Sequence, residues 1–250
     1  GALQGCSGLF VPGGWASNKL KSLGDEGIDA IRRFVREGGS YLGFCGGAGL
    51  ATEEGIGLLG IKRKPTRERV PSFSGRIRLR ISDHRVWRGA EEPVFHAWWP
   101  SQFVVEDEAV KILASYGEAL PGSFSSDLNV EDVEKYGSWE ELEKIYRIKL
   151  DPRRLLNEPA VVEGAYGSGK VVLSLVDFDT PDDDSGAAVL RNMWEYLTGR
   201  LPTGGRSVGE FSAADPGTAL DVSRLFDLCS EVISLGLRNF LWFWRNPMLL

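Results

Sequence analysis

The chain has 250 residues, of which 42% are hydrophobic and 26% charged, a composition typical of a globular protein with an apolar core. The formal net charge of −6 argues against nucleic-acid binding through a generally basic surface. Three cysteines, Cys6, Cys45 and Cys229, are too few and odd in number for a disulfide framework. Because no signal peptide is visible either, we expect a cytoplasmic protein.

A short apolar strand is predicted close to the start of the chain, over residues 7–11. It ends in the turn Pro12-Gly13-Gly14, and we expect residues 15–24 to form a loop. A helix is predicted from Asp25, where apolar residues recur at helical spacing, to the stop signal Gly38-Gly39. Since a parallel sheet rarely opens so abruptly, we expect N-terminal sequence to be missing.

A second strand, predicted over residues 41–44, leads into Cys45 and then into a helix that extends to about Glu54. Gly43 and Gly47 flank the cysteine, as a strand that turns straight into a helix requires small neighbours. A thiol at a helix N-terminus would be favoured as a thiolate. The alternative is a buried cysteine in a tight glycine turn. Strands and helices alternate here, which predicts a parallel sheet whose strand ends bring the diglycine and the cysteine together.

Residues 62–88 are strongly basic. Arg76, Arg78 and Arg80 alternate with apolar residues, so they lie on one face of a predicted strand. A solvated sheet face is the favoured interpretation, and a cradle for an anionic substrate or a nucleic acid is the alternative. The aromatic stretch that follows contains His96 and Trp98, which we expect in a strand and loop near the site. His96 is either a packed histidine or a base.

The second half of the chain begins with a strand predicted over residues 110–115 and an acidic, polar segment. A hairpin with Gly167-Ser168-Gly169 at its turn then leads into Asp177-Phe178-Asp179. A helix follows over residues 187–197. The sequence contains no metal-ligand pattern, and we expect neither a metal nor another cofactor.

The predicted domain organisation has three parts. One domain covers residues 1–200 and carries the acidic insert at about 117–150; a linker follows at 201–217, and an amphipathic helix at 218–250. The aromatic end of that helix predicts docking on the domain, on a partner protein or on another copy in a homo-oligomer. No uncharged run is long enough for a transmembrane segment.

Three stretches together resemble the class I glutamine amidotransferase-like superfamily. They are Val11-Pro12-Gly13-Gly14, the helix end leading into Gly38-Gly39-Ser40-Tyr41-Leu42-Gly43, and Phe44-Cys45-Gly46-Gly47-Ala48. The similarity spans residues 7–200 and is greatest to the N-terminal-type domain of biotin–protein ligases and its stand-alone bacterial and archaeal forms. It implies an α/β fold, a flavodoxin-like three-layer sandwich with a mostly parallel sheet, a nucleophile elbow at Cys45 and, here, a C-terminal helical extension. No ligase catalytic domain is recognisable, so biotinylation is not expected.

The resemblance also implies roles for individual residues. Cys45 matches the nucleophile that attacks a side-chain amide and forms a thioester, and Gly14 and Gly46, with Gly13 beside them, match the oxyanion hole. Members of the superfamily usually carry a histidine and an acid after a late strand, where this chain has Asp177 and Asp179. A carboxylate cannot relay a proton as an imidazole does, and its charge would raise the thiol pKa. The triad is therefore degenerate.

Two functions remain open from the sequence. The first is a cysteine-dependent amidase or amidotransferase-like hydrolase that uses Cys45, with His96 as a displaced base. The second is a non-catalytic module that binds a ligand or a partner protein on the same fold. A small amide or carboxylate is the expected ligand, with the three alternating arginines and Trp98 as weaker candidates for contacts. Binding of nucleic acid is not expected.

Overall fold

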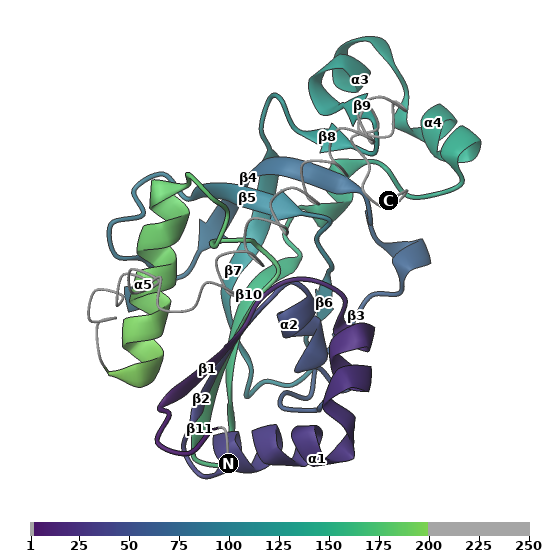
Figure 1. Ribbon diagram of the computed structural model, residues 1–250. Helices are drawn as coiled ribbons and strands as arrows, with labels where there is room; N and C mark the ends of the chain where they lie inside the picture. Colours follow the sequence, from purple (N-terminus) through teal and green to yellow (C-terminus); the bar gives the residue numbers. More distant parts are fainter. Residues whose placement is uncertain (1–2, 200–250) are drawn as a thin grey trace, which may run out of the picture. The chain divides into compact units, whose positions relative to one another are not determined.

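A computed structural model describes residues 3–199 of the chain (Figure 1). Strand β1 (Gly8–Val11) lies parallel to β2 (Ser40–Phe44), which lies parallel to β11 (Gly169–Ser174). Every residue of β2 is buried, as expected for a strand covered on both faces. The strands predicted at 7–11 and 41–44 are confirmed, and they form the parallel part of the sheet.

The connection from β1 to β2 is helix α1 (Ala16–Arg36), so the loop predicted over 15–24 is wrong. Ala16, Leu20 and Leu23 recur at helical spacing and pack against the core, which stabilises a helix over this stretch. The helix is kinked at Gly24, where φ is 58°. The helix predicted from Asp25 is therefore the second half of α1.

The other strands of the main sheet pair antiparallel, and the sheet order is β1-β2-β11-β10-β7-β4-β8-β9, with β5 beside β4. The predicted hairpin is confirmed as β10 and β11. This hairpin reverses the chain direction, so the predicted mostly parallel sheet is found only over β1, β2 and β11, and the sheet as a whole is mixed. The strands are β4 (Phe73–Ile81), β5 (Val94–Trp98), β7 (Lys111–Ala119), β8 (Phe124–Ser125), β9 (Leu128–Asn129) and β10 (Pro159–Tyr166).

Helices cover both faces of the parallel strands. Figure 1 shows α5 (Asp184–Thr198) on one side, with α1 and α2 (Gly46–Leu50) on the other. Successive residues of β2 reach opposite layers: the Ser40 hydroxyl donates to Leu197 O of α5 at 2.8 Å, and the Tyr41 hydroxyl donates to Gly47 O of α2 at 2.7 Å. Helix α2 ends at Leu50, earlier than predicted, because the chain folds back there and Ile56 N–H donates to Leu50 O.

A two-stranded ribbon lies off the main sheet. It pairs β3 (Lys62–Arg63) with β6 (Phe103–Val104), and three short 3₁₀ helices connect the larger elements: η1 (Thr66–Glu68), η2 (Arg85–Trp87) and η3 (Pro152–Leu155). None of the helices within residues 3–199 has both the length and the apolar character that a membrane crossing requires. The predicted linker at 201–217, the predicted helix at 218–250 and Cys229 lie outside the described residues.

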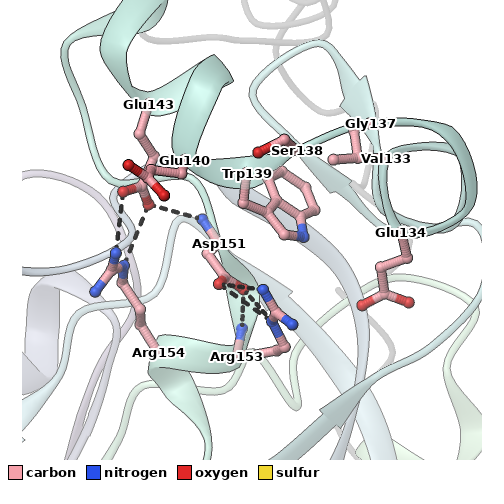
Figure 2. A pocket seen from close by; sticks show the side chains of 10 residues that line it. All are labelled: Val133, Glu134, Gly137, Ser138, Trp139, Glu140, Glu143, Asp151, Arg153 and Arg154. Atoms are coloured by element: carbon pink, nitrogen blue, oxygen red, sulfur yellow. Dashed lines mark hydrogen bonds and ion pairs between the residues drawn. The ribbon is translucent and has the colours of Figure 1, made fainter.

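The acidic segment from 117 to 150 contains β8, β9 and two short helices, α3 (Val130–Tyr136) and α4 (Trp139–Tyr146). It has a small apolar cluster of its own, in which Val130, Val133 and Leu150 pack with Trp139. A pocket of about 580 Å³ lies between α3, α4 and η3, with the indole of Trp139 at its wall (Figure 2).

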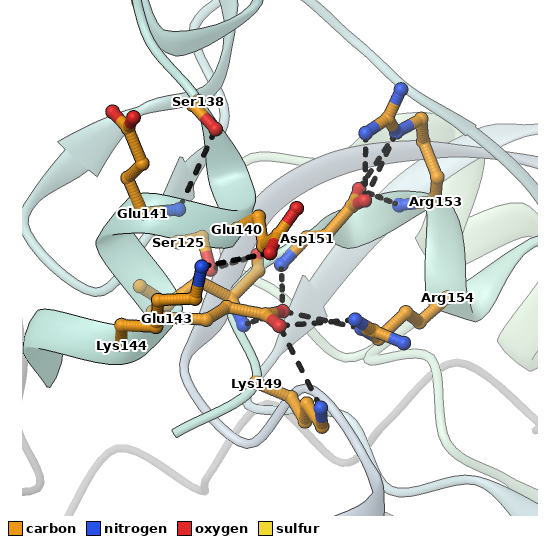
Figure 3. A network of polar contacts seen from close by, with 11 residues as sticks. Ser125, Ser138, Glu140, Glu141, Glu143, Lys144, Lys149, Asp151, Arg153 and Arg154 are labelled. Atoms are coloured by element: carbon orange, nitrogen blue, oxygen red, sulfur yellow. Dashed lines mark hydrogen bonds and ion pairs between the residues drawn. The ribbon is translucent and has the colours of Figure 1, made fainter. Parts of the chain in front are cut away.

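Glu143 connects α4 to the chain that follows it (Figure 3). Its carboxylate accepts from the N–H groups of Leu150 at 2.9 Å and Asp151 at 3.2 Å, and from Arg154 at 3.0 Å. Burial alone would raise the pKa of Glu143, but the hydrogen bonds from Arg154, Leu150 and Asp151 lower it to about 2. The charged form of Glu143 therefore ties α4 to residues 150–154.

Replacing Glu143 with Gln should lower the unfolding free energy at pH 7 by about 2 kcal/mol, because hydrogen bonds to a charged group are lost. A depressed folded-state pKa contributes stability above the usual pKa of 4.5, and that contribution disappears as the pH falls towards 2. The difference between the two proteins should therefore shrink between pH 5 and pH 3 in urea titrations. Glu140→Gln is the matched control, since this side chain is 80% exposed; an equal loss for both variants would contradict the assignment.

Candidate functional site

Cys45 is the residue between β2 and α2, and its backbone is left-handed, with φ 48° and ψ −107°. Such a conformation is strained for any residue except glycine, by about 1–3 kcal/mol, and strain of this kind clusters at functional sites. The glycines around it allow the end of β1 to press against the turn. A Cβ placed on Gly46 would lie 1.5 Å from Gly14 O, and one on Gly47 would lie 2.0 Å from Val11 O.

The diglycine after β1 meets the cysteine, as the sequence predicts for two strand ends in a parallel sheet. A Cβ built on Gly13 would lie 3.9 Å from Cys45 Sγ, and the N–H groups of Gly14 and Gly46 hydrogen-bond to the Cys45 side chain. Two backbone donors therefore converge on one thiol, which is half-buried.

The pKa of the thiol is shifted in the direction opposite to the expectation. Burial and the charge of Asp177 raise the pKa of Cys45, and they outweigh the two backbone hydrogen bonds, which lower it. Helix α2 has only five residues, so it contributes little dipole to offset them. The expectation that a helix N-terminus favours a thiolate here is therefore wrong in sign, whereas the effect expected from the carboxylate is confirmed.

Asp177 follows the end of β11 and is 7% exposed. Its Oδ2 accepts from the N–H of Trp98 at 2.9 Å. Burial, with a smaller effect of the neighbouring Asp179, raises the pKa of Asp177 to about 7, and the hydrogen bond from Trp98 only partly opposes the rise. Asp179 is itself exposed, and partial desolvation also raises its pKa. Both carboxylates interact electrostatically with Cys45.

His96 lies on β5, where its Nδ1 is 3.1 Å from Asp183 Oδ2 and its ring stacks on Trp98 with centroids 5.5 Å apart. Its carbonyl accepts from the N–H of Asp177 at 3.0 Å. The backbone of His96 is thus next to the site. Its imidazole faces Asp183, and among residues 3–199 no described contact joins that imidazole to Cys45.

Trp98 and the alternating arginines occupy different places. Trp98 is 37% exposed beside Asp177, and its indole N–H donates to the Thr180 hydroxyl at 3.0 Å. Arg76, Arg78 and Arg80 share the exposed face of β4, which confirms the predicted alternation. Arg80 is bound to Glu118 at 3.2 Å, and no described contact joins the three to Cys45.

Sequence reasoning missed Arg69 and Tyr116. The Arg69 guanidinium and the Tyr116 phenol both interact electrostatically with Cys45. Tyr116 is completely buried in the core, and its hydroxyl donates to Ser101 O at 3.2 Å. The basic stretch at 62–88 contained the signal for Arg69, but nothing in its spacing distinguishes this arginine from the others.

Two described pockets lie away from the cysteine. The first is the one in the acidic segment (Figure 2), where Glu143 pairs with Arg154 and Asp151 with Arg153. The second, of about 810 Å³, lies between η2 and α5. In the first, both arginines are already paired with carboxylates, and neither pocket brings a nucleophile to converging backbone donors. The surroundings of Cys45 are therefore the stronger candidate for chemistry.

Comparison with known proteins gives a family match and several structural similarities. The family described as "Biotin-protein ligase, N terminal" matches residues 3–55, which confirms the resemblance over the stretch that holds β1, α1, β2, Cys45 and α2. No curated protein matches. Similar solved structures include a glutamine amidotransferase (20% identity, 79% of this chain and 82% of that chain, TM-score 0.47). PurLQS from Thermotoga maritima (13%, 76% and 80%, 0.48) and a cytoplasmic protein from Salmonella typhimurium LT2 (12%, 77% and 72%, 0.46) are also similar.

Proposed function

We propose that this chain is a glutamine amidotransferase-like amide hydrolase, with Cys45 as the nucleophile of a nucleophile elbow and Asp177 as its acid and base. The observation that supports it most is the convergence of the Gly14 and Gly46 N–H groups on the Cys45 side chain. Donors placed there would also face the oxygen of a carbonyl under attack by the sulfur. Each such donor is worth about 3 kcal/mol in the transition state.

The reaction needs one group that takes a proton and returns it. Asp177 takes the proton of the thiol while sulfur bonds to the carboxamide carbon, and the two N–H groups bind the resulting oxyanion. Asp177 then gives the proton to the departing nitrogen, the C–N bond breaks, ammonia leaves and a thioester remains. Water attacks the thioester with its proton going to Asp177, and the thiolate leaves with that proton. The products are ammonia and a carboxylic acid.

The environment of Asp177 supports this role for a carboxyl group. An acid–base catalyst works best when its pKa is near the working pH. The pKa of an ordinary aspartate, 3.8, is far below that pH. Burial raises the pKa of Asp177 to about 7, the range in which an imidazole would act. Asp177, the residue that makes the triad degenerate, thus has a pKa suited to the role of the histidine that it replaces.

The second candidate function is a non-catalytic module that binds a small ligand or a partner. The raised pKa of the Cys45 thiol favours it, because an uncharged thiol is a weak nucleophile. The orientation of His96 towards Asp183 favours it as well, since the displaced base of the sequence-based hypothesis is then occupied elsewhere. The layers formed by α1 and α2, the parallel strands and α5 support a flavodoxin-like sandwich under either function.

Ammonia release from a panel of small carboxamides tests the proposal. The full chain should release ammonia from at least one amide, Cys45→Ser should reduce the rate at least about 100-fold, and Cys6→Ser should leave it unchanged. Cys6 is the matched control because it is an exposed free cysteine. Binding of these amides, seen as a rise in melting temperature, without ammonia release would instead establish the binding module.

A further inference from the structure

An unpartnered hydrogen-bond donor lies in the wall of the pocket between α3, α4 and η3. Trp139 is 6% exposed, and its indole Nε1 is a buried polar atom without a hydrogen-bond partner. Figure 2 shows this nitrogen on the edge of the ring that faces Arg153 and Glu134, which also line the pocket. Buried donors are normally paired. The indole therefore offers an unused hydrogen bond to an acceptor that enters the pocket.

The charged groups of η3 on the opposite wall already have partners. Asp151 accepts from the backbone N–H of Arg153 at 3.0 Å and from its guanidinium at 2.8 Å, and Glu143 accepts from Arg154 at 3.0 Å. Neither arginine is therefore available to an anionic ligand. The volume of the pocket, about 580 Å³, is within the range of roughly 300–1,000 Å³ that is typical of ligand sites.

The wall formed by α3 and α4 is acidic. Residues 130–146 include six carboxylates and two lysines, and each lysine is bound to a carboxylate of its own helix. Among the carboxylates that line the pocket, Glu134 is the one that forms no ion pair with another residue of the described chain. It interacts electrostatically with Arg153, whose ion-pair partner is Asp151. A cationic group of a ligand would supply the partner that Glu134 lacks.

An exposed aromatic ring adjoins the pocket. Tyr136, the last residue of α3, is 86% exposed and directly precedes the lining residue Gly137. Aromatic residues are enriched at protein interfaces, and their rings also attract cations. The pocket therefore suits a ligand with a carbonyl for the indole, a cation for Glu134 and enough length to extend over Tyr136. A basic peptide has all three features.

We propose that the pocket between α3, α4 and η3 binds a lysine-containing segment of a partner protein. A main-chain carbonyl of that segment accepts from Trp139 Nε1, and a lysine ammonium pairs with Glu134. The indole nitrogen is covered in the structure, so binding includes a small outward movement of exposed side chains at the rim, Glu134 among them. The interaction makes no use of Cys45, and it stands whether or not the chain hydrolyses amides.

The indole N–H resonance of Trp139 in ¹⁵N NMR spectra of the full chain tests this proposal. The probe is the blocked peptide acetyl-Ala-Lys-Ala-Lys-Ala-amide, and the resonance is assigned through its contacts with neighbouring protons. We expect the peptide to shift this resonance to lower field and to saturate the shift, because the N–H becomes hydrogen-bonded. A peptide with glutamine at both lysine positions should bind at least about fivefold more weakly, since it lacks the cation.

Two variants test the residues assigned to the site. Glu134→Gln should weaken binding of the lysine peptide about fivefold. Glu141→Gln is the matched control, because it removes the same charge from an exposed residue of α4 that does not line the pocket, and it should bind as the wild type does. Trp139→Phe keeps an aromatic ring without the donor and should also bind about fivefold more weakly. Since Glu134 is exposed, the comparison of the two glutamine variants holds even if Trp139→Phe fails to fold.

Three results would overturn the proposal. The first is a Trp139 resonance that the lysine peptide does not move. The second is wild-type affinity in Glu134→Gln. The third is a shift of the same resonance by spermidine as large as that caused by the peptide, because spermidine has cationic groups but no carbonyl, and the ligand would then be a polyamine and not a polypeptide.

Discussion

Replacing Asp177 with Asn should make Cys45 easier to alkylate and at the same time abolish amide hydrolysis. The charge of Asp177 raises the pKa of the Cys45 thiol, so its removal increases the thiolate fraction. We expect alkylation by iodoacetamide at pH 8 to become about tenfold faster. Turnover should fall roughly 100-fold or more, because an asparagine can neither accept nor return the proton. Opposite effects on one sulfur distinguish an acid–base residue from one that merely supports the fold.

The pH dependence of this effect follows from the pKa of Asp177, which is about 7. Below pH 6 the carboxyl is protonated and as uncharged as the asparagine, so the variant and the wild type should be alkylated at similar rates. Above pH 8 the carboxylate is charged in the wild type, and the difference should reach its full size. A ratio of the two rates that does not change between pH 5.5 and 8.5 would contradict a carboxyl that titrates near 7 beside the thiol.

Unfolding experiments test the raised pKa of Asp177 independently of alkylation. A carboxyl whose pKa rises from 3.8 to about 7 on folding stabilises the folded protein at low pH, and this contribution is lost as the pH rises through 7. The wild type should therefore lose stability between about pH 4 and pH 7, by at most about 4 kcal/mol from this group, and the loss should level off above pH 7. Asp177→Asn should lack that loss and be the more stable protein at pH 8.

Two controls identify the residue responsible. Asp179→Asn removes a charge that raises the pKa of Cys45 less than the charge of Asp177 does, so it should accelerate alkylation less and retain turnover. His96→Gln tests the displaced base of the sequence-based hypothesis and should also retain turnover, since the imidazole faces Asp183. Loss of turnover in His96→Gln, with turnover kept in Asp177→Asn, would transfer the base role to the histidine.

Local patterns in the sequence were sufficient for β1, β2 and the turn at Cys45. The apolar run before Cys45 predicts a buried strand. The glycines around Cys45 and the diglycine after β1 predict tight turns, and together these features predict that the two strand ends meet. The direction of the remaining strands depends on which strand pairs with which. Only the β10–β11 hairpin has a local signal for its pairing, the turn Gly167-Ser168-Gly169. The pairing of the other antiparallel strands could therefore not be predicted.

The candidate site was also predictable only where local turns determine it. Residues brought together by the chain's own turns, such as Gly14 and Cys45, could be placed from sequence because the turn fixes both. Arg69 and Tyr116 reach the site through pairings between β3 and β6 and between β4 and β7, which carry no local signal. The sign of the thiol pKa was equally hidden, because burial is a property of the folded protein and not of the glycine pattern around Cys45.

Gly46→Ala should be among the most damaging single substitutions in the chain. The added Cβ would lie 1.5 Å from the carbonyl oxygen of Gly14 and 2.5 Å from its carbon, and both are backbone atoms that cannot rotate away. The end of β1 would have to move off the turn, which we expect to cost at least about 3 kcal/mol of unfolding free energy. Urea titration measures this cost directly.

Gly60→Ala is the matched control for this substitution. Gly46 and Gly60 both have backbones that an alanine can adopt, and the nearest atoms to a Cβ at Gly60 are side-chain oxygens at 3.6 and 3.8 Å, which is ordinary contact. The control should stay within about 0.5 kcal/mol of the wild type. Because the same movement of β1 withdraws the Gly14 N–H from the thiol, folded Gly46→Ala protein should also lose ammonia release. Equal stability of the two variants would show that β1 does not press on the turn, and the oxyanion site would then lack its first donor.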